Sequence, residues 1–257
     1  MSGNSLPPDA SAQWRGAVPA QGAGAAERGG GNVRTLNHSP VESAVAEGAS
    51  PVSSLEQLKR RSRRPGEASF FYFDPHFQYN TAKVLPGEYF VSREDMAIVT
   101  VLGSCIAACL WDRVMRIGGM NHFMLPEGDS ADVSGRYGSY AMELLINEML
   151  KLGARRESLQ AKIFGGGQVM HNFASMNVGE RNTAFVTDYL QTERIPIVSR
   201  DVLDIYPRKV VFFPVTGKAM VKRLAHAHPE ELVLQERTRG NAAVVARNTA
   251  GGSIDLF

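Results

Sequence analysis

The sequence predicts a domain of mixed α/β (α+β) class in which β-sheets and helices form layers. Three observations support this fold class. Apolar runs rich in β-branched residues recur along the middle of the chain, which is typical of strands. Two longer segments carry apolar residues at helical spacing. The two kinds of segment follow one another without strict β-α-β alternation, which favours a mixed or layered sheet over a doubly wound parallel one.

The predicted strands come first in this domain. The stretch MAIVTVLGSCIAACLWD (96–112) predicts a strand, a Gly-Ser turn and a second strand. The stretch RIGGMNHFMLP (116–126) predicts another strand that ends at Pro126, because proline cannot donate a hydrogen bond within a sheet. Turn-forming residues separate these last two strands, so we expect them to pair in a hairpin-like manner.

Helices and further strands are predicted in the second half of the chain. Residues 137–154 carry apolar side chains at helical spacing: Met142, Leu145, Met149 and Leu152. Residues 178–195 predict a second amphipathic helix. LQAKIFGGGQVM (159–170) predicts a strand that runs into a glycine turn. Residues 195–224 predict three more strands, the last two joined around PVTGK.

Composition divides the chain into three parts. Residues 1–67 consist mainly of Gly, Ala, Ser and Pro, so we expect a disordered tail that buries too little apolar surface to fold. Residues 68–237 form the predicted catalytic domain, and residues 238–257 predict a flexible C-terminal tail. Within the first tail, residues 54–67 predict a short helix that ends in a basic run. We interpret that run as a solvated linker, with contact to an acidic partner or nucleic acid as the alternative.

Composition also narrows the class of protein. The formal net charge is +2 and charged residues make up 21% of the chain, which gives no general reason to expect nucleic acid or a membrane as partner. No apolar stretch approaches the roughly 20 residues that span a bilayer, and no secretory signal is evident. We therefore expect a cytoplasmic protein without direct membrane insertion. The two cysteines, Cys105 and Cys109, lie too far apart on one strand for a disulfide, which fits a reduced compartment.

Cys105 is the candidate nucleophile. A thiol must lose its proton before it attacks, and a histidine within hydrogen-bond reach can take that proton. His122 lies on the next predicted strand, where a hairpin brings it close to Cys105. The hydroxyl of Thr100 can orient the imidazole as the third member of a triad. A buried packing cysteine is the alternative, because most free cysteines are of that kind.

The residues around Cys105 refine this hypothesis. Gly103 and Ser104 allow a tight turn, so that backbone amides of this loop can form an oxyanion site. Cys109 lies between Ala108 and Leu110, and we interpret it as a packing residue of the core.

Other candidate sites carry weaker patterns. His226 and His228 are close in sequence but have no cysteine nearby, so we interpret them as solvated surface rather than metal ligands. FGGGQVM (164–170) lacks the ending of a phosphate-binding loop. Backbone crowding, or close approach to a bound chain, explains its glycines better. We therefore expect no metal site and no organic cofactor.

Six stretches of the sequence occur in an order that resembles a known family. They are TVLGSCIAACLWD, GGMNHFMLP, RYGSYAMELLINEMLKLGA, AKIFGGGQVM, VGERN and PRKVVFFPVTGKAMVKRL. Residues 85–225 thus resemble the chemoreceptor glutamine deamidases of bacterial chemotaxis, the CheD family. The resemblance implies layered β-sheets with helices on one side, related to the catalytic domains of deamidating toxins. The chain departs from it at 199–209, where Leu203 and Asp204 stand in a turn for which we expect glycines.

The resemblance also implies an activity and partners. It implies Cys105 as nucleophile, His122 as general base and Thr100 as the third triad member. The expected reaction converts glutamine side chains of methyl-accepting chemotaxis receptors to glutamate, with a role in adaptation. The substrate is expected on the receptor's cytoplasmic helical bundle, which requires an open and shallow pocket. A chemotaxis phosphatase is a further expected partner.

Two other functions stay open at this stage. The domain can act mainly as an adaptor that binds a chemotaxis phosphatase or a receptor, with little or no catalysis. It can also bind nucleic acid through the basic run at 59–64. The near-neutral domain and the lack of aromatic residues within that run argue against the second function.

Overall fold

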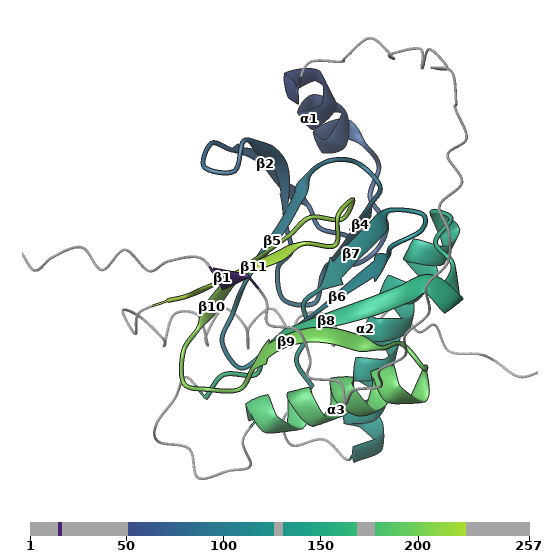
Figure 1. Cartoon of the computed structure of the whole chain (residues 1–257), viewed down its shortest axis with the longest axis vertical. Coiled ribbons are helices and arrows are strands. Elements are labelled where there is room, and N and C mark those ends of the chain that lie inside the picture. The colour runs from purple at the N-terminus through teal and green to yellow at the C-terminus, as the bar shows by residue number, and fades with distance from the viewer. Residues whose placement is uncertain (1–14, 17–50, 126–130, 169–177, 225–257) are drawn as a thin grey trace, which may run out of the picture.

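Residues 15–16, 51–125, 131–168 and 178–224 are described by the structure, a computed structural model of the chain. Within these ranges two β-sheets pack face to face through a shared apolar core. Helices α2 (Ala131–Lys151) and α3 (Val178–Thr192) lie against the second sheet, on the face turned away from the first (Figure 1). The predicted mixed α/β class, with layered sheets and helices on one side, is confirmed.

The first sheet has six strands and supplies Thr100. Their order is β1 (Arg15–Gly16), β11 (Ala219–Arg223), β10 (Arg208–Phe212), β5 (Ala97–Leu102), β3 (Tyr79–Lys83) and β2 (Phe70–Asp74). Ile98 and Leu102 of β5 are buried in the core between the sheets. Side chains alternate along a strand, so Thr100 also faces the second sheet.

The second sheet has five strands and supplies the segments that carry Cys105 and His122. Their order is β4 (Tyr89–Ser92), β7 (Ile117–Asn121), β6 (Ile106–Asp112), β8 (Leu159–Gly165) and β9 (Ile197–Val202). β6 and β7 are antiparallel neighbours, with Cys109 opposite Met120. The predicted hairpin-like pairing is confirmed. A 3-10 helix, Arg156–Ser158, leads into β8.

The two faces of β6 belong to two different cores. Ile106, Ala108 and Leu110 pack against α2 and α3. Cys105, Ala107 and Cys109 pack in the layer between the sheets. This alternation follows from the period of two along a strand. It places the candidate nucleophile between the sheets, on the side away from the helices.

The ordered part of the chain begins earlier than the composition predicts. Helix α1 (Pro51–Arg60) packs Leu55 and Leu58 against the core between the sheets. Further upstream, Arg15 pairs with Val221 and Gly16 with Met220 at the edge of the first sheet. The expectation of disorder through residue 67 is therefore wrong for these segments. They bury their apolar or backbone groups against the domain, a contribution that local composition does not reveal.

The basic run after α1 is exposed to solvent, and several of its side chains contact the domain. Arg61 pairs with Glu67, and Arg64 pairs with the buried side chain of Glu148 on α2. The Arg61 guanidinium lies 5.8 Å from the centre of the Phe90 ring, and that of Arg63 lies 5.4 Å from the centre of the Phe71 ring. These three arginines are solvated, as predicted, but their contacts hold the segment against the domain.

No helix in the described ranges is long and apolar enough to cross a membrane. The expected C-terminal tail at 238–257 lies outside the described residues, as do His171, His226 and His228.

Candidate functional site

Thr100 and His122 meet across the two sheets. Thr100 Oγ1 lies 2.9 Å from His122 Nδ1, and both residues are buried. The Thr100 hydroxyl also donates a hydrogen bond of 2.7 Å to the backbone carbonyl of Val84. The structure thus brings together two of the three residues of the predicted triad.

These two contacts fix the tautomer of the histidine. A hydroxyl has one proton, and that of Thr100 is directed to the Val84 carbonyl, which is only an acceptor. Thr100 Oγ1 must therefore accept at its contact with His122, so Nδ1 carries the ring proton. Nε2 of the neutral ring is left with its lone pair. A histidine in this tautomer can act as a base through Nε2.

Burial keeps the His122 ring neutral. Desolvation lowers its pKa to about 3, although a hydrogen bond to the Val84 carbonyl opposes the shift. Its backbone is fixed by Gly87 N–H, which donates to the His122 carbonyl at 2.7 Å, and by the Glu88 carbonyl, which accepts from His122 N–H at 3.0 Å. Nε2 is buried and makes no hydrogen bond within the described part of the chain. A buried ring nitrogen without a partner is unusual in a stable core, and it marks a place where function is expected.

Cys105 lies on the same face of the second sheet as His122. The β6–β7 pairing continues beyond the strands as a bridge between Ile106 and Phe123, whose backbone groups exchange two hydrogen bonds of 2.9 Å. In this register His122 is opposite Ala107 and diagonal to both Cys105 and Cys109. Diagonal neighbours have Cα atoms about 7–8 Å apart, within reach of a long or aromatic side chain. The hairpin thus brings Cys105 into the neighbourhood of the imidazole.

The Cys105 thiol is more enclosed than we expect for a site that acts on a glutamine of a folded helix. Cys105 is 0% exposed and His122 is 1% exposed. The expectation of an open and shallow pocket is wrong for the structure as it stands. Cys105 lies among apolar residues of the inter-sheet core, which include Leu102 and Phe164.

The loop before Cys105 is fixed through its backbone carbonyls. Gly167 N–H donates to the Gly103 carbonyl at 2.8 Å, and Gly166 N–H donates to the Cys105 carbonyl at 2.7 Å. The Ser104 carbonyl accepts from the side-chain amide of Asn182 on α3 at 2.9 Å. All three candidate oxyanion residues are therefore held in defined orientations.

The glycine run after β8 is packed against this loop. Gly165 and Gly166 have φ values of +107° and +65°, a region that favours glycine. A Cβ atom on Gly165 would lie 2.1 Å from the Cys105 carbonyl oxygen. The interpretation of the glycines as a site of backbone crowding is confirmed.

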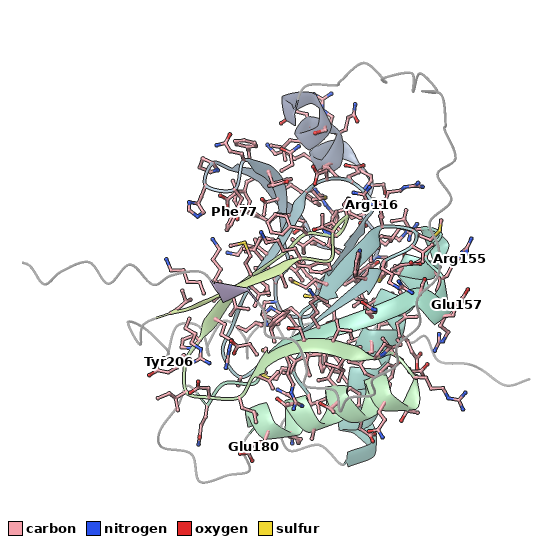
Figure 2. The ribbon with its side chains drawn as sticks, in the orientation of Figure 1. Phe77, Arg116, Arg155, Glu157, Glu180 and Tyr206 are labelled. Atoms are coloured by element: carbon pink, nitrogen blue, oxygen red, sulfur yellow. The ribbon has the colours of Figure 1, made fainter. Side chains whose placement is uncertain are left out.

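A buried arginine supports the glycine run from the other side. Arg208 is 0% exposed and donates to the Asp201 carboxylate at 2.7 Å and to the Tyr206 carbonyl at 3.1 Å. It also binds the carbonyl of Leu203, a residue that together with Asp204 has positive φ, at 64° and 69°. These left-handed residues stand where glycines were expected. Figure 2 shows Tyr206 in this β9–β10 loop, far from Arg116 in the β6–β7 turn.

Sequence reasoning missed Asn182 and Arg208. Asn182 lies on the buried stripe of α3 with Val186 and Leu190, so a polar residue at an apolar position is the signal that could have revealed it. Arg208 begins β10 and has no comparable pattern. Burial raises the pKa of the Cys109 thiol, which agrees with its interpretation as a packing residue. No group of three or more His, Cys, Asp or Glu side chains within the described ranges could hold a metal ion.

Comparison with known sequences shows that this chain is similar to one group of bacterial proteins. The family model "CheD chemotactic sensory transduction" matches residues 124–223. A protein of Albidiferax ferrireducens named "Probable chemoreceptor glutamine deamidase CheD 1" is 72% identical over 206 residues, which are 80% of this chain and 88% of the relative. A "Probable chemoreceptor glutamine deamidase CheD" of Methylobacillus flagellatus is 53% identical over 196 residues, covering 74% of this chain and 96% of the relative.

Comparison with solved structures found a more distant protein. The crystal structure of the hypothetical protein YfiH of Bacillus licheniformis is 11% identical, with a TM-score of 0.30, and covers 52% of this chain and 59% of that protein. A similarity at that level carries no conclusion about the site.

Proposed function

Because this chain belongs to the CheD family, we propose that it is a chemoreceptor glutamine deamidase in which Cys105, His122 and Thr100 carry out the reaction. The observation that supports this most is the orientation of His122. The Thr100 hydroxyl holds Nδ1–H and leaves the lone pair of Nε2 in the layer that contains the Cys105 thiol. A base oriented by a third group is one requirement of covalent amide hydrolysis, and the other, a hydrogen bond between Nε2 and the thiol, must form when the site closes on its substrate, because Nε2 has no partner among the described residues.

The first half of the reaction forms a covalent intermediate. His122 Nε2 takes the proton of the Cys105 thiol as the sulfur attacks the side-chain carbonyl carbon of glutamine. The carbonyl oxygen becomes an oxyanion, which backbone amides of the loop at Gly103, Ser104 and Cys105 stabilise. The imidazolium then gives its proton to the leaving nitrogen. Ammonia departs as the C–N bond breaks, and a glutamyl thioester remains on Cys105.

The second half releases the product. His122 takes a proton from water, and the resulting hydroxide attacks the thioester carbon. The C–S bond breaks, the sulfur regains a proton from the imidazolium, and glutamate leaves. Each glutamine thus consumes one water and yields one ammonia. The low pKa of His122 favours transfer of the thiol proton together with attack, rather than a stable ion pair beforehand.

Membership of the family supports a proposal for the substrate and partners. We infer that the substrate glutamines lie on the cytoplasmic helical bundle of methyl-accepting chemotaxis receptors, and that the protein acts in the cytoplasm. Deamidation adds a negative charge to the receptor and creates a glutamate that can later be methylated. A chemotaxis phosphatase is the second partner that we propose. Because Cys105 is buried, the loop around it must move when a glutamine enters.

Co-expression with a receptor tests the activity. We expect mass spectrometry of receptor peptides to show glutamine converted to glutamate with the wild-type protein and with Cys105→Ser to show none. Cys109→Ala serves as the matched control, because it alters the other buried thiol on the same strand face. Full conversion by Cys105→Ser would contradict the proposal. A receptor that binds both proteins but is converted by neither would favour the adaptor function.

A further inference from the structure

Asn182 joins the two chain segments of the proposed site. Its side chain is 0% exposed and uses both ends of its amide. Nδ2 donates to the Ser104 carbonyl at 2.9 Å, and Oδ1 accepts from Leu125 N–H at 3.0 Å. Ser104 precedes the nucleophile, and Leu125 lies just after the segment that carries His122. One helix side chain therefore connects the nucleophile loop to the histidine segment.

The bond to Ser104 also sets the direction of the next backbone amide. The Ser104 carbonyl and the Cys105 N–H belong to one planar trans peptide, so they point in opposite directions. Because the carbonyl points to Asn182 on α3, the Cys105 N–H points away from α3. The Cys105 side chain packs between the sheets, which is also the side away from α3. The bond to Asn182 therefore fixes the peptide that carries the Cys105 amide, in the residue that also carries the thiol.

The position of this amide suits an oxyanion donor. When Sγ attacks a carbonyl carbon, the oxygen that gains charge lies beside the new C–S bond. The amide of the same residue is close to that bond, so a fixed orientation of its peptide can help it stabilise the charge as it develops. The neighbouring Gly103 and Cys105 carbonyls are held by backbone amides of Gly167 and Gly166. The Ser104 carbonyl is held by a side chain, so a substitution can release this peptide.

We propose that Asn182 is a positioning residue that orients the Cys105 amide as an oxyanion donor. This inference rests on the proposed function, because it assigns a role within the same reaction. Asn182→Asp keeps the shape and the acceptor for Leu125 but replaces the donor with a carboxylate oxygen facing the Ser104 carbonyl. Asn182→Leu removes both polar ends. Loss of one oxyanion donor commonly lowers kcat by about 10²- to 10³-fold, and a misdirected donor should lower it by about 10- to 100-fold.

The test compares kcat, KM and thiol reactivity in these two variants. Thr187→Val on the same helix is the control. The Thr187 hydroxyl donates to the Thr183 carbonyl within α3 at 2.7 Å, a bond that does not involve the nucleophile loop. We expect ammonia release from a receptor fragment to show a reduced kcat with KM within about twofold of wild type in both Asn182 variants. The rate of Cys105 alkylation by iodoacetamide should keep its wild-type pH profile, because alkylation forms no oxyanion. Thr187→Val should match wild type.

Several outcomes would overturn the inference. An unchanged kcat in folded Asn182 variants would show that the amide needs no such orientation. A kcat loss accompanied by an altered alkylation profile, or loss of folding in both variants, would assign Asn182 a purely structural role. Failure of the proposed function would give a different result from failure of this inference. In that case Cys105→Ala would release ammonia as the wild type does. Full kcat in the Asn182 variants, together with an inactive Cys105→Ala, would overturn this inference alone.

Discussion

Thr100 Oγ1 and His122 Nδ1 lie 2.9 Å apart, although Thr100 is on β5 of the first sheet and His122 directly follows β7 of the second. The Val84 carbonyl accepts a hydrogen bond from the Thr100 hydroxyl, so the hydroxyl oxygen acts as acceptor towards the ring. The ring proton therefore stays on Nδ1. The packing of one sheet on the other thus determines which nitrogen of His122 can serve as a base.

Thr100→Val should reduce catalysis because it removes the hydroxyl that keeps the ring proton on Nδ1. The variant removes the hydroxyl that both the Val84 carbonyl and His122 Nδ1 contact, so the ring is held less firmly in its orientation. We expect kcat for ammonia release to fall by about 10- to 100-fold. Thr100→Ser keeps the hydroxyl and should retain most of the activity. Equal kcat values for the two variants would show that the hydroxyl has no role in orienting the ring.

His122 should make the folded state sensitive to acid. Its pKa is about 3 when folded, against an ordinary value of 6.5, so the unfolded chain binds more protons between these values. The free energy of unfolding therefore falls as pH drops from 6.5 towards 3, by about 1.4 kcal/mol per pH unit from this group. Urea unfolding should show a smaller loss over pH 6.5–4 for His122→Gln than for wild type. Parallel pH dependences would mean that His122 titrates normally in the folded protein.

Cys105 and Cys109 should differ in chemistry despite equal burial. Both are 0% exposed on one face of the second sheet and both are diagonal to His122, but Cys109 lies within β6, whereas Cys105 directly follows the Gly103–Ser104 turn. Burial raises the pKa of Cys109, so its thiolate is scarce at neutral pH. We expect iodoacetamide to label Cys105 first, as peptide mapping would reveal. Preferential labelling of Cys109 would contradict the assigned roles.

Asp112 should stabilise the hairpin that brings Cys105 and His122 together. Its carboxylate accepts from the backbone amides of Val114 at 2.8 Å, Met115 at 3.0 Å and Arg155 at 2.6 Å. Although burial raises the pKa of Asp112, these hydrogen bonds outweigh it and hold the pKa below its ordinary value. Asp112→Ala should lower the free energy of unfolding by about 1–3 kcal/mol at pH 7. A Glu157→Ala variant, which changes an exposed carboxylate, should leave it near wild type, and equal losses in both would exclude a specific role for Asp112.

Much of the fold was predictable from local pattern. Apolar runs identified β5 to β11, and helical spacing identified α2 and α3, although α2 begins at Ala131 rather than 137. The short strands β2, β3 and β4 were not predicted, because runs of four or five residues mix aromatic and polar side chains. Helix α1 was expected within a disordered tail. Its order comes from Leu55 and Leu58 packing on distant strands, which no local window contains.

The reacting residues of the candidate site were predictable from the sequence, but the residues that hold them in place were not. The identities and strand positions of Cys105 and His122 suggested a pairing, and the hairpin register places them diagonally. The Thr100–His122 contact depends on the packing of two sheets. Asn182 and Arg208 act on backbone carbonyls. A backbone carbonyl is present in every residue, so the sequence does not show which one a side chain binds. The roles of Asn182 and Arg208 are therefore visible only in the fold.

The most direct test of the central claim is to find the acyl group on Cys105. A receptor fragment is mixed with the wild-type protein, quenched in acid within the first turnover and digested at low pH for mass spectrometry. We predict that the peptide containing Cys105 carries the substrate peptide less one ammonia, as a thioester, and that Cys109 carries none. Steady ammonia release with no adduct on Cys105, or with the adduct on another residue, would contradict the account.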